Sequence, residues 1–457
     1  MKMPDRQVTV LVVDGGGRGD VLAEAHARSP HVGKVVVAPG NGLIAWKQTY
    51  GKVCVDPNCD LKNADSITAA AKRHRVDYVD VAQDDAVASD AVQRLHGCGI
   101  HAFGPTGPAA RIEWDKYWQR RFAERWHIPV PDWAPFRIEH AGRAIEYLEA
   151  RYRGDPDAVL WIKAGGLCAG KGARRAGSFA EALRRIEETK ALGATAEIFL
   201  IEDGIDGEES SHTAITDGTG FFHEFKAARD HKGAAERGKG GREWEMTGGM
   251  GALAPARPIG LSSWEGAKYH LIEKALKGFH VEGLQYKGIL YAGAIAPKSR
   301  RQGFGVMPFC LEHNARWGDP EAQVIVPGIQ NDYFEMMDAA VDGRLREIEI
   351  REDALYRVSV AIAARGYPGN SDAARGKRIF GLEAVLKMPD IRVYGAGVIV
   401  ENGGFYVGGG RLLHIVGEGA TLDEAHDRVY AAVEEVRGED DCIYYRRDIG
   451  LLDLRAA

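Results

Sequence analysis

The sequence predicts an α/β protein of several domains, in which an N-terminal doubly wound parallel sheet precedes two regions of α+β type. In the first hundred residues, apolar runs at 8–14, 34–39, 78–82 and 100–103 alternate with helix-length segments, the pattern of a buried parallel sheet. Beyond residue 190, neighbouring apolar runs are joined by short polar turns, which favours antiparallel pairing. With 457 residues, 45% of them hydrophobic, the chain can form three or four domains.

The turns that follow the four N-terminal strands are expected to meet at one edge of the sheet, where ligands of such sheets bind. They comprise residues 15–18, 39–41, 83–85 and 104–106. The first turn reads GGGRG rather than GxGxxG, and no acidic residue ends the second strand, so a dinucleotide is disfavoured. A phosphorylated sugar near Arg18 fits this turn better.

Composition narrows the classes of partner. The formal net charge is −6 and the sequence pI is about 6.2, so no broad basic field for nucleic acid is expected. The six cysteines show no CxxC pairs, which favours reduced thiols in a cytoplasmic protein. No apolar stretch is long enough to cross a bilayer. We therefore expect small-molecule partners, no nucleic acid and no membrane.

The segment 160–177 carries Lys163, then a glycine-rich loop with Lys171. Backbone amides of such a loop approach phosphates closely, and lysine supplies a point charge. Residues 165–171 have the spacing of a Walker loop, but Gly172 stands where Ser or Thr should be, which argues against a P-loop kinase or GTPase. A nucleotide-phosphate loop is the leading interpretation, and a flexible surface hairpin is the alternative.

Three further patterns organise the rest of the chain. Ser178 and Glu181 form a capping box that begins a helix, so the glycine-rich loop belongs to a small α+β unit. The runs 288–296 and 306–314 are expected to pair as antiparallel strands across a polar turn. From about residue 337, helices and strands form a separate C-terminal lobe, in which Thr421 and Glu424 make a second capping box.

Glu312 and Asn314 are two residues apart in an expected strand, so their side chains share one face while His313 points to the other. Two oxygen ligands on one face suit magnesium, which completes its shell with water and phosphate. The alternative is that the pair binds a nearby loop. Arg316 follows closely and could hold a carboxylate or an acyl phosphate through two hydrogen bonds.

A charged, glycine-rich loop separates the segments 230–232 and 245–252 and has no sign of regular structure. Long irregular loops are often functional. Asp230 and Lys232 are therefore candidate site residues, with a solvated turn as the alternative.

Motifs spread along nearly the whole chain resemble those of the phosphoribosylamine-glycine ligases of the ATP-grasp superfamily. They are VAPGN, FGPT, KAGGLCAGKG, IDGEES, RDHK, TGGMGA, LYAG, EHNARWGDPE, GYPG, NGGFYVGGGR and DDCIYYRRDIG, in the family's order. The resemblance implies a doubly wound domain at 1–106, an ATP-grasp domain at 107–336 with a lid at about 125–195, and a C-terminal domain at 337–457. It also implies ATP with Mg²⁺, or Mn²⁺ as an alternative ion, and a monomer or homodimer.

The resemblance assigns roles to individual residues. Lys116, Lys163, Gly170, Lys171 and Gly172 would bind ATP phosphates, Glu202, Asp203 and Ile205 the adenine, and Glu209 the ribose. Glu312 and Asn314 would bind the metal, and Arg316, Lys232 and Asp230 would be catalytic. The substrate-binding set would be Gly17, Arg18, Gly40, Asn41, Asp84, Thr247, Gly248, Gly249 and Met250. The implied reaction forms an amide from an amino acid and an amine, which can be phosphorylated, through an acyl phosphate.

Several substrate turns depart from the family pattern. GGREH becomes GGRGD at Gly19 and Asp20, GPEAPL becomes AQDDAV around Asp84, and GPN becomes Trp244–Met246. Three hypotheses follow: a phosphoribosylamine-glycine ligase, a paralogue that joins another acid and amine in specialised metabolism, or a non-catalytic nucleotide-binding protein. The altered turns predict weak phosphoribosylglycinamide formation, whereas the retained Lys163, Glu312 and Arg316 weigh against the third hypothesis.

Overall fold

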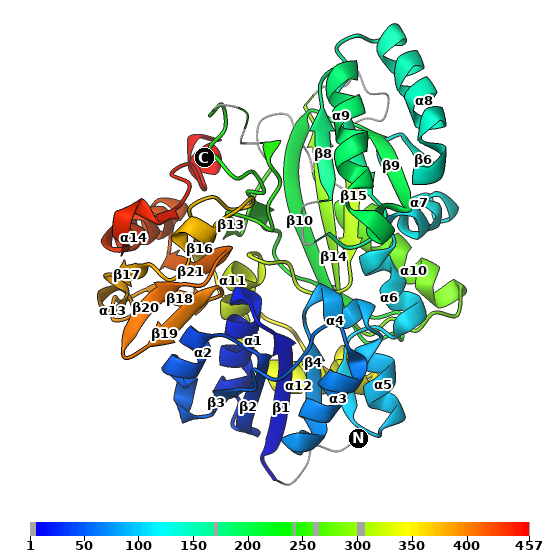
Figure 1. The fold of residues 1–457 in the computed structure, drawn as a ribbon. Helices are drawn as coiled ribbons and strands as arrows, with labels where there is room; N and C mark the ends of the chain where they lie inside the picture. The colour runs from blue at the N-terminus through cyan, green and yellow to red at the C-terminus, as the bar shows by residue number, and fades with distance from the viewer. Residues whose placement is uncertain are drawn as a thin grey trace.

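The computed structural model describes residues 6–168, 172–239, 241, 244–258, 264, 266–298 and 307–456. Three regions surround the middle of the molecule in Figure 1: the N-terminal sheet, a central sheet with the lid above it, and the C-terminal lobe. No helix of the described residues is both long and apolar enough to cross a membrane.

The N-terminal region is a five-stranded sheet in which all neighbouring strands are parallel, in the order β3-β2-β1-β4-β5. The strands are β1 (Val8–Asp14), β2 (Val32–Pro39), β3 (Val53–Val55), β4 (Tyr78–Val81) and β5 (His101–Phe103). The helices between them are α1 (Gly17–Arg28), α2 (Gly42–Lys47), α3 (Ala64–Arg73), α4 (Asp84–Ala88) and α5 (Ala91–Gly97). The predicted doubly wound sheet is confirmed, but β3 was not predicted, because three residues show no periodicity.

The lid follows two connecting helices, α6 (Gly107–Trp114) and α7 (Lys116–Arg125). Its antiparallel sheet has the order β6-β9-β7-β8, formed by β6 (Trp133–Arg137), β7 (Leu160–Ala164), β8 (Ala173–Ala176) and β9 (Ile198–Asp203), with α8 (Ala141–Gly154) and α9 (Phe179–Lys190). The capping box is present: the Ser178 hydroxyl accepts the Glu181 N–H, and the Glu181 carboxylate accepts the Gly177 N–H. The glycine-rich loop therefore joins β7 to β8.

The central sheet has the order β11-β10-β14-β15. It consists of β10 (Gly207–Thr216), β11 (Phe222–Glu224), β14 (Gly288–Pro297) and β15 (Phe309–Asn314), and α10 (Lys274–Val281) packs nearby. The predicted antiparallel pairing of β14 with β15 is confirmed, with Gly293 opposite Glu312 and Tyr291 opposite Asn314. The candidate metal residues thus lie at the end of the edge strand.

The C-terminal lobe is built on a sheet of order β12-β13-β16-β21-β18, with β23 paired to β16. Its strands are β12 (Arg229–Asp230), β13 (Gly251–Ala254), β16 (Tyr356–Ala364), β18 (Ile391–Gly395), β21 (Arg411–Gly419) and β23 (Ile443–Tyr444). A small sheet of β19 (Val398–Glu401), β20 (Gly404–Val407), β17 (Arg378–Phe380) and β22 (Arg437–Gly438) adjoins it. The lobe's helices are α13 (Leu382–Val385), α14 (Leu422–Glu435) and α15 (Leu451–Ala456).

The chain does not keep these regions separate. Strands β12 and β13 precede the last two strands of the central sheet in the sequence but pair with the C-terminal lobe. Helices α11 (Ala322–Ile325) and α12 (Tyr333–Asp342) follow β15, and both contact α1 of the N-terminal region. The loops after β12 and β15 are therefore held between the regions.

Candidate functional site

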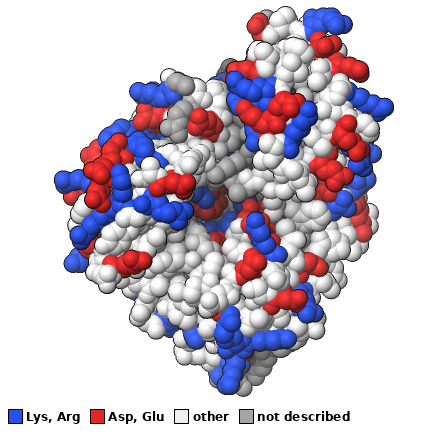
Figure 2. Space-filling model, in the orientation of Figure 1, with Lys and Arg blue, Asp and Glu red and all other residues white. Residues whose placement is uncertain are grey.

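A cavity of about 1260 Å³ opens where the lid, the central sheet, the N-terminal sheet and the C-terminal lobe meet. Figure 2 shows the hollow, with acidic and basic side chains inside it. The predicted site residues that line it are Arg18, Asp84, Lys116, Lys163, Gly172, Glu202, Asp203, Ile205, Glu209, Asp230, Lys232, Thr247, Gly248, Glu312, Asn314 and Arg316. The fold thus brings residues from four regions of the molecule to one cavity.

Five predicted substrate residues do not line the cavity: Gly17, Gly40, Asn41, Gly249 and Met250. Asn41 instead accepts the backbone N–H groups of Leu43 and Ile44 at the start of α2. Its amide also donates to the carbonyls of Gly15 and Gly395, which joins the first turn to the C-terminal lobe. Two predicted phosphate residues, Gly170 and Lys171, lie outside the described residues.

At the lid end of the cavity, one carboxylate binds two cations. The Glu202 carboxylate lies 2.6 Å from Lys163 Nζ and accepts hydrogen bonds from Arg120 Nε and Nη2 at 2.8 and 3.0 Å. Burial alone would raise the pKa of Glu202, but the charges of Arg120 and Lys163 lower it to about 2. The group is therefore ionised at neutral pH and fixes the direction of Lys163. Arg120, which follows Lys116 by one helical turn, was not among the predicted site residues.

Glu312 and Asn314 line the cavity from the same face of β15. His313 points away and binds the Leu271 carbonyl, as the strand alternation predicts. Lys232 donates to Glu312 Oε1 at 3.0 Å and lowers the pKa of that carboxyl. Within the described part of the chain, the second Glu312 oxygen and the Asn314 amide make no hydrogen bond. An ionised carboxylate and an amide oxygen with free capacity fit a magnesium ion.

Arg316 is oriented by Glu113, which was not among the predicted site residues. Its Nε lies 3.2 Å from the Glu113 carboxylate of α6, and its Nη1 donates to the Trp317 carbonyl. The second Glu113 oxygen accepts the Ala315 N–H. Glu113 is buried, so it holds both the backbone and the guanidinium of this segment in place.

A buried cluster of Ser211, Tyr291 and Glu321 lies beside the Asp230–Lys232 segment. The Ser211 hydroxyl donates to Glu321 at 2.8 Å and contacts the Tyr291 hydroxyl at 3.1 Å. Burial first, and then the nearby Glu321 charge, raise the pKa of Asp230. Asp230 therefore borders a buried acidic group, and its Oδ1 accepts the His231 N–H at 2.6 Å.

Arg411 of the C-terminal lobe ties two cavity loops together. Its Nη1 donates to the carbonyls of Gly248, Gly249 and Asp319, and its Nη2 binds the Asp319 carboxylate at 2.7 Å. The loop after β15 and the loop before β13 are therefore positioned by one guanidinium from a third region. This arginine, in the GGGR motif, had no assigned role in the sequence analysis.

Some of the residues that depart from the family pattern line the cavity, and one lies outside it. Asp20 lies outside it, where its carboxylate binds Lys47 Nζ and accepts the Gly395 N–H. It faces away from the cavity without capping its own helix, because it pairs with α2 and the C-terminal lobe instead. Asp84, Trp244 and Met246 do line the cavity, and the Arg175 guanidinium of the lid lies 4.6 Å from the centroid of the Trp244 ring.

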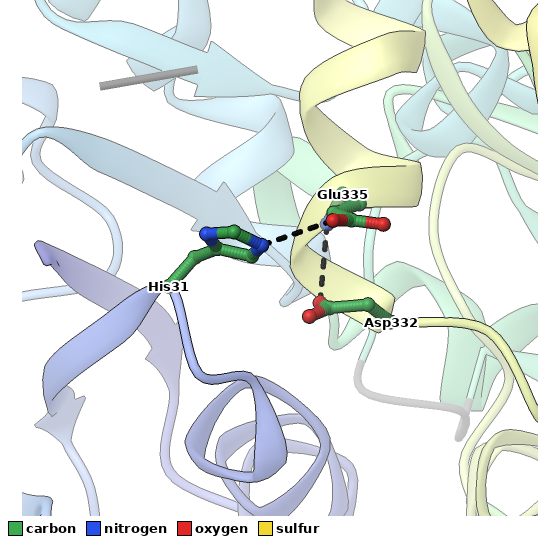
Figure 3. A group of neighbouring side chains, drawn as sticks. All are labelled: His31, Asp332 and Glu335. Carbon is green, nitrogen blue, oxygen red and sulfur yellow. Dashed lines mark hydrogen bonds and ion pairs between the residues drawn. The ribbon is translucent and has the colours of Figure 1, made fainter. Parts of the chain in front are cut away.

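One group outside the cavity has metal-ligand residue types: His31, Asp332 and Glu335 (Figure 3). Its polar atoms already have structural partners. Asp332 caps α12 through the N–H groups of Phe334 and Glu335 and accepts the Ser29 hydroxyl, while His31 Nε2 lies 3.0 Å from Glu335. The group joins the N-terminal sheet to α12.

Models of known protein families match most of the chain. Models described as the N domain, the ATP-grasp (A) domain and the C domain of phosphoribosylglycinamide synthetase match residues 8–113, 114–322 and 357–452. The chain belongs to the phosphoribosylglycinamide synthetase family. It is an ATP-dependent ligase of the class that forms C–N amide bonds. The family predicted from the sequence motifs is confirmed.

Individual relatives agree with this family. The ligase is 33% identical to the phosphoribosylamine–glycine ligase of Chlorobaculum tepidum, over 96% of this chain and 99% of the relative. It is 32% identical to the human trifunctional purine biosynthetic protein adenosine-3, of whose length the match covers 41%. The crystal structure of a phosphoribosylamine–glycine ligase from Thermotoga maritima superposes with a TM-score of 0.73 at 26% identity, covering 97% of this chain and 100% of that one.

A more distant likeness concerns the fold alone. The biotin carboxylase domain of a Hydrogenobacter thermophilus 2-oxoglutarate carboxylase has a TM-score of 0.70 at 17% identity, and the match covers 98% of this chain and 93% of that one. The arrangement of a parallel sheet, a lid and a central sheet therefore occurs in proteins with little sequence in common with the ligase.

Proposed function

We propose that the ligase activates the carboxylate of a small amino acid, glycine in the first instance, with ATP and joins it to an amine. The observation that carries this proposal is the meeting of Lys163, Lys232 and Arg316 with the Glu312–Asn314 pair around one cavity. Phosphoryl and acyl transfer of this kind requires positioned cationic side chains and a metal ion. It does not require a protein nucleophile. The names of the relatives support glycine as the acid and phosphoribosylamine as the reference amine.

ATP would bind between the lid and the central sheet. Lys163 is directed toward the cavity by Glu202, and Lys116 lies at the N-terminus of α7 on the same wall. The backbone of 203–205 follows β9 along the cavity and is available for the adenine, with Glu209 beyond it for the ribose. Lys163 on β7, the backbone after β9 and Glu209 on β10 all line this one cavity, which supports its assignment to a single nucleotide.

The reaction would proceed in two steps. An oxygen of the amino-acid carboxylate attacks the γ-phosphorus, the bond to the bridging oxygen breaks, and ADP leaves. The amine nitrogen then attacks the acyl carbon, the carbon–oxygen bond to phosphate breaks, and the amine loses one proton to phosphate or water. Arg316, held by Glu113, would stabilise charge on the acyl phosphate, and Lys232 and Asp230 would orient the amino acid.

Magnesium is the proposed metal, with Mn²⁺ as an alternative. Glu312 and Asn314 would hold the ion, which would neutralise phosphate charge and orient the oxygens for transfer. The protein contributes the ionised Glu312, kept so by Lys232, and the fixed spacing of the two side chains on β15. A cytoplasmic location and a monomer or homodimer remain part of the proposal.

Trapping of the acyl phosphate by hydroxylamine tests this function without knowledge of the amine. With ATP and magnesium, we expect glycine to give glycyl hydroxamate and stoichiometric ADP, whereas larger amino acids give less. Arg316→Lys retains the charge but cannot form bidentate hydrogen bonds, so it should reduce hydroxamate formation. Absence of hydroxamate and of ADP release with every amino acid tried would reject the proposed activation.

A further inference from the structure

The first turn of the N-terminal sheet already contains an anion of its own. The Asp14 carboxylate, at the end of β1, accepts the Gly16 N–H through Oδ1 at 2.6 Å. Its Oδ2 accepts the Arg18 Nε hydrogen bond at 2.7 Å. These are the two donors, a backbone amide at the start of α1 and an arginine, that would otherwise attract a phosphate to this turn. Both side chains are buried and both line the cavity.

The neighbouring Gly19 is matched to this arrangement. A Cβ atom on residue 19 would lie 2.8 Å from the Asp14 Cβ and 3.2 Å from its Cγ. Atoms do not approach so closely without displacement, so any side chain at 19 would push Asp14 out of the turn. One of the departures in this turn is therefore explained: Gly19 leaves room for the Asp14 carboxylate.

Other carboxylates surround the same turn. A Cβ on Gly16 would lie 3.5 Å from Asp319 Oδ2, and Asp84 and Asp85, at the start of α4, also line the cavity. The remaining Arg18 nitrogen with a described partner, Nη1, donates to the Trp317 carbonyl. Arg411 of the C-terminal lobe, which also lines the cavity, is bound to Asp319. A phosphate brought to this turn would therefore compete with the Asp14 carboxylate for its donors and meet further carboxylates beside it.

We infer that the amine substrate presents a hydroxyl or an ammonium group, and not a phosphate, to the turn after β1, and that Asp14 sets this selectivity. The inference rests on the proposed ligase reaction and adds the chemistry of one end of its amine. A phosphate elsewhere on the amine would have to point away from Asp14, Asp84 and Asp85. The buried Asp14 acts by occupying the anion position, so it is a specificity-determining residue and not a catalytic one.

The test compares two amines that differ only in a phosphate. Ribosylamine and 5-phosphoribosylamine form in solution from ammonia with ribose or ribose 5-phosphate, and the measured quantity is the ratio of their kcat/KM values with glycine. Asp14→Asn keeps the size of the side chain but removes its charge, so Arg18 becomes available. We expect the ratio to shift toward the phosphorylated amine by at least ~5-fold, since charge complementarity governs such preferences. A smaller shift would overturn the inference.

Two further variants make the result unambiguous. Asp20→Asn is the matched control, because Asp20, on the helix that follows Asp14, is also a buried aspartate but pairs outside the cavity. Its ratio should equal that of the wild type. Arg18→Gln tests the competing explanation, in which Arg18 binds the phosphate of the amine. In that case only the phosphorylated amine would lose activity, which would contradict the inference. We expect both amines to be affected alike. Glycyl hydroxamate formation, which needs no amine substrate, reports on the proposed activation separately and shows that each variant is folded.

Discussion

Lys163 Nζ lies 2.6 Å from the Glu202 carboxylate that Arg120 also binds through two nitrogens. Glu202 and Arg120 are almost fully buried, whereas 13% of the Lys163 side chain is exposed. One negative charge thus faces two positive charges. The excess positive charge is directed toward the cavity, which is the arrangement required to attract nucleotide phosphates.

Removal of Lys163 should therefore weaken ATP binding more than it weakens the fold. In Lys163→Ala, Arg120 still satisfies Glu202, and we expect ATP affinity to fall roughly 10- to 100-fold, the loss of one charge-assisted hydrogen bond. Isothermal titration calorimetry measures the affinity. Lys190→Ala, in the same lid but exposed and paired with Glu187, is the control. Unchanged ATP affinity in Lys163→Ala would remove this lysine from the nucleotide site.

Glu202 should also make the protein sensitive to acid. Its pKa of about 2 in the folded state lies below the value of about 4.3 for an unfolded glutamate. The stabilisation is thus complete above the unfolded pKa and is lost as the pH falls toward 2. The difference in unfolding free energy between the wild type and Glu202→Gln should shrink over this interval in urea denaturation. Glu139→Gln, at an exposed position of the same lid, is the comparison variant, and a difference for Glu202→Gln that stays constant with pH would refute the explanation.

Metal dependence should be concentrated in Glu312. We expect Glu312→Gln to lower turnover at limiting magnesium by at least ~10-fold, with partial recovery at high magnesium, because one charged ligand is lost. Hydroxamate formation across a magnesium titration measures this effect. Glu224→Gln is a suitable comparison, since Glu224 belongs to the same sheet and binds His212. If Glu312→Gln keeps the wild-type magnesium dependence, the Glu312–Asn314 pair is structural.

The contact between Arg175 and Trp244 should hold β8 of the lid against the loop before β13. Cation–π contacts of exposed groups contribute about 0.5–1 kcal/mol, so Arg175→Ala should accelerate amide hydrogen exchange in 173–176 without nucleotide. ATP should slow exchange in the wild type, because closure buries this strand. Arg174→Ala, which loses a contact with Glu188 inside the lid, serves for comparison. Equal exchange with and without ATP would exclude nucleotide-linked closure.

The local sequence determined much of this architecture. Apolar runs followed by glycines fixed the parallel sheet, and the Ser178–Glu181 box fixed the start of α9, because both signals act over a few residues. The alternation in FCLEHN placed Glu312 and Asn314 on one face and His313 on the other. These features are encoded by neighbours in the chain, so one segment suffices to read them.

Tertiary structure decided which charges remain available. Glu202 and Arg120 are 82 residues apart, Arg411 reaches Asp319 across 92 residues, and no local pattern predicts either pair. Asp20 and Asp14 are both acids near the first turn, yet one pairs with Lys47 outside the cavity and the other occupies the turn itself. The sequence by itself determined the family and the residue types of the site. Which donors are already satisfied depends on contacts between distant segments, since electrostatic interactions follow distance in space and not in sequence.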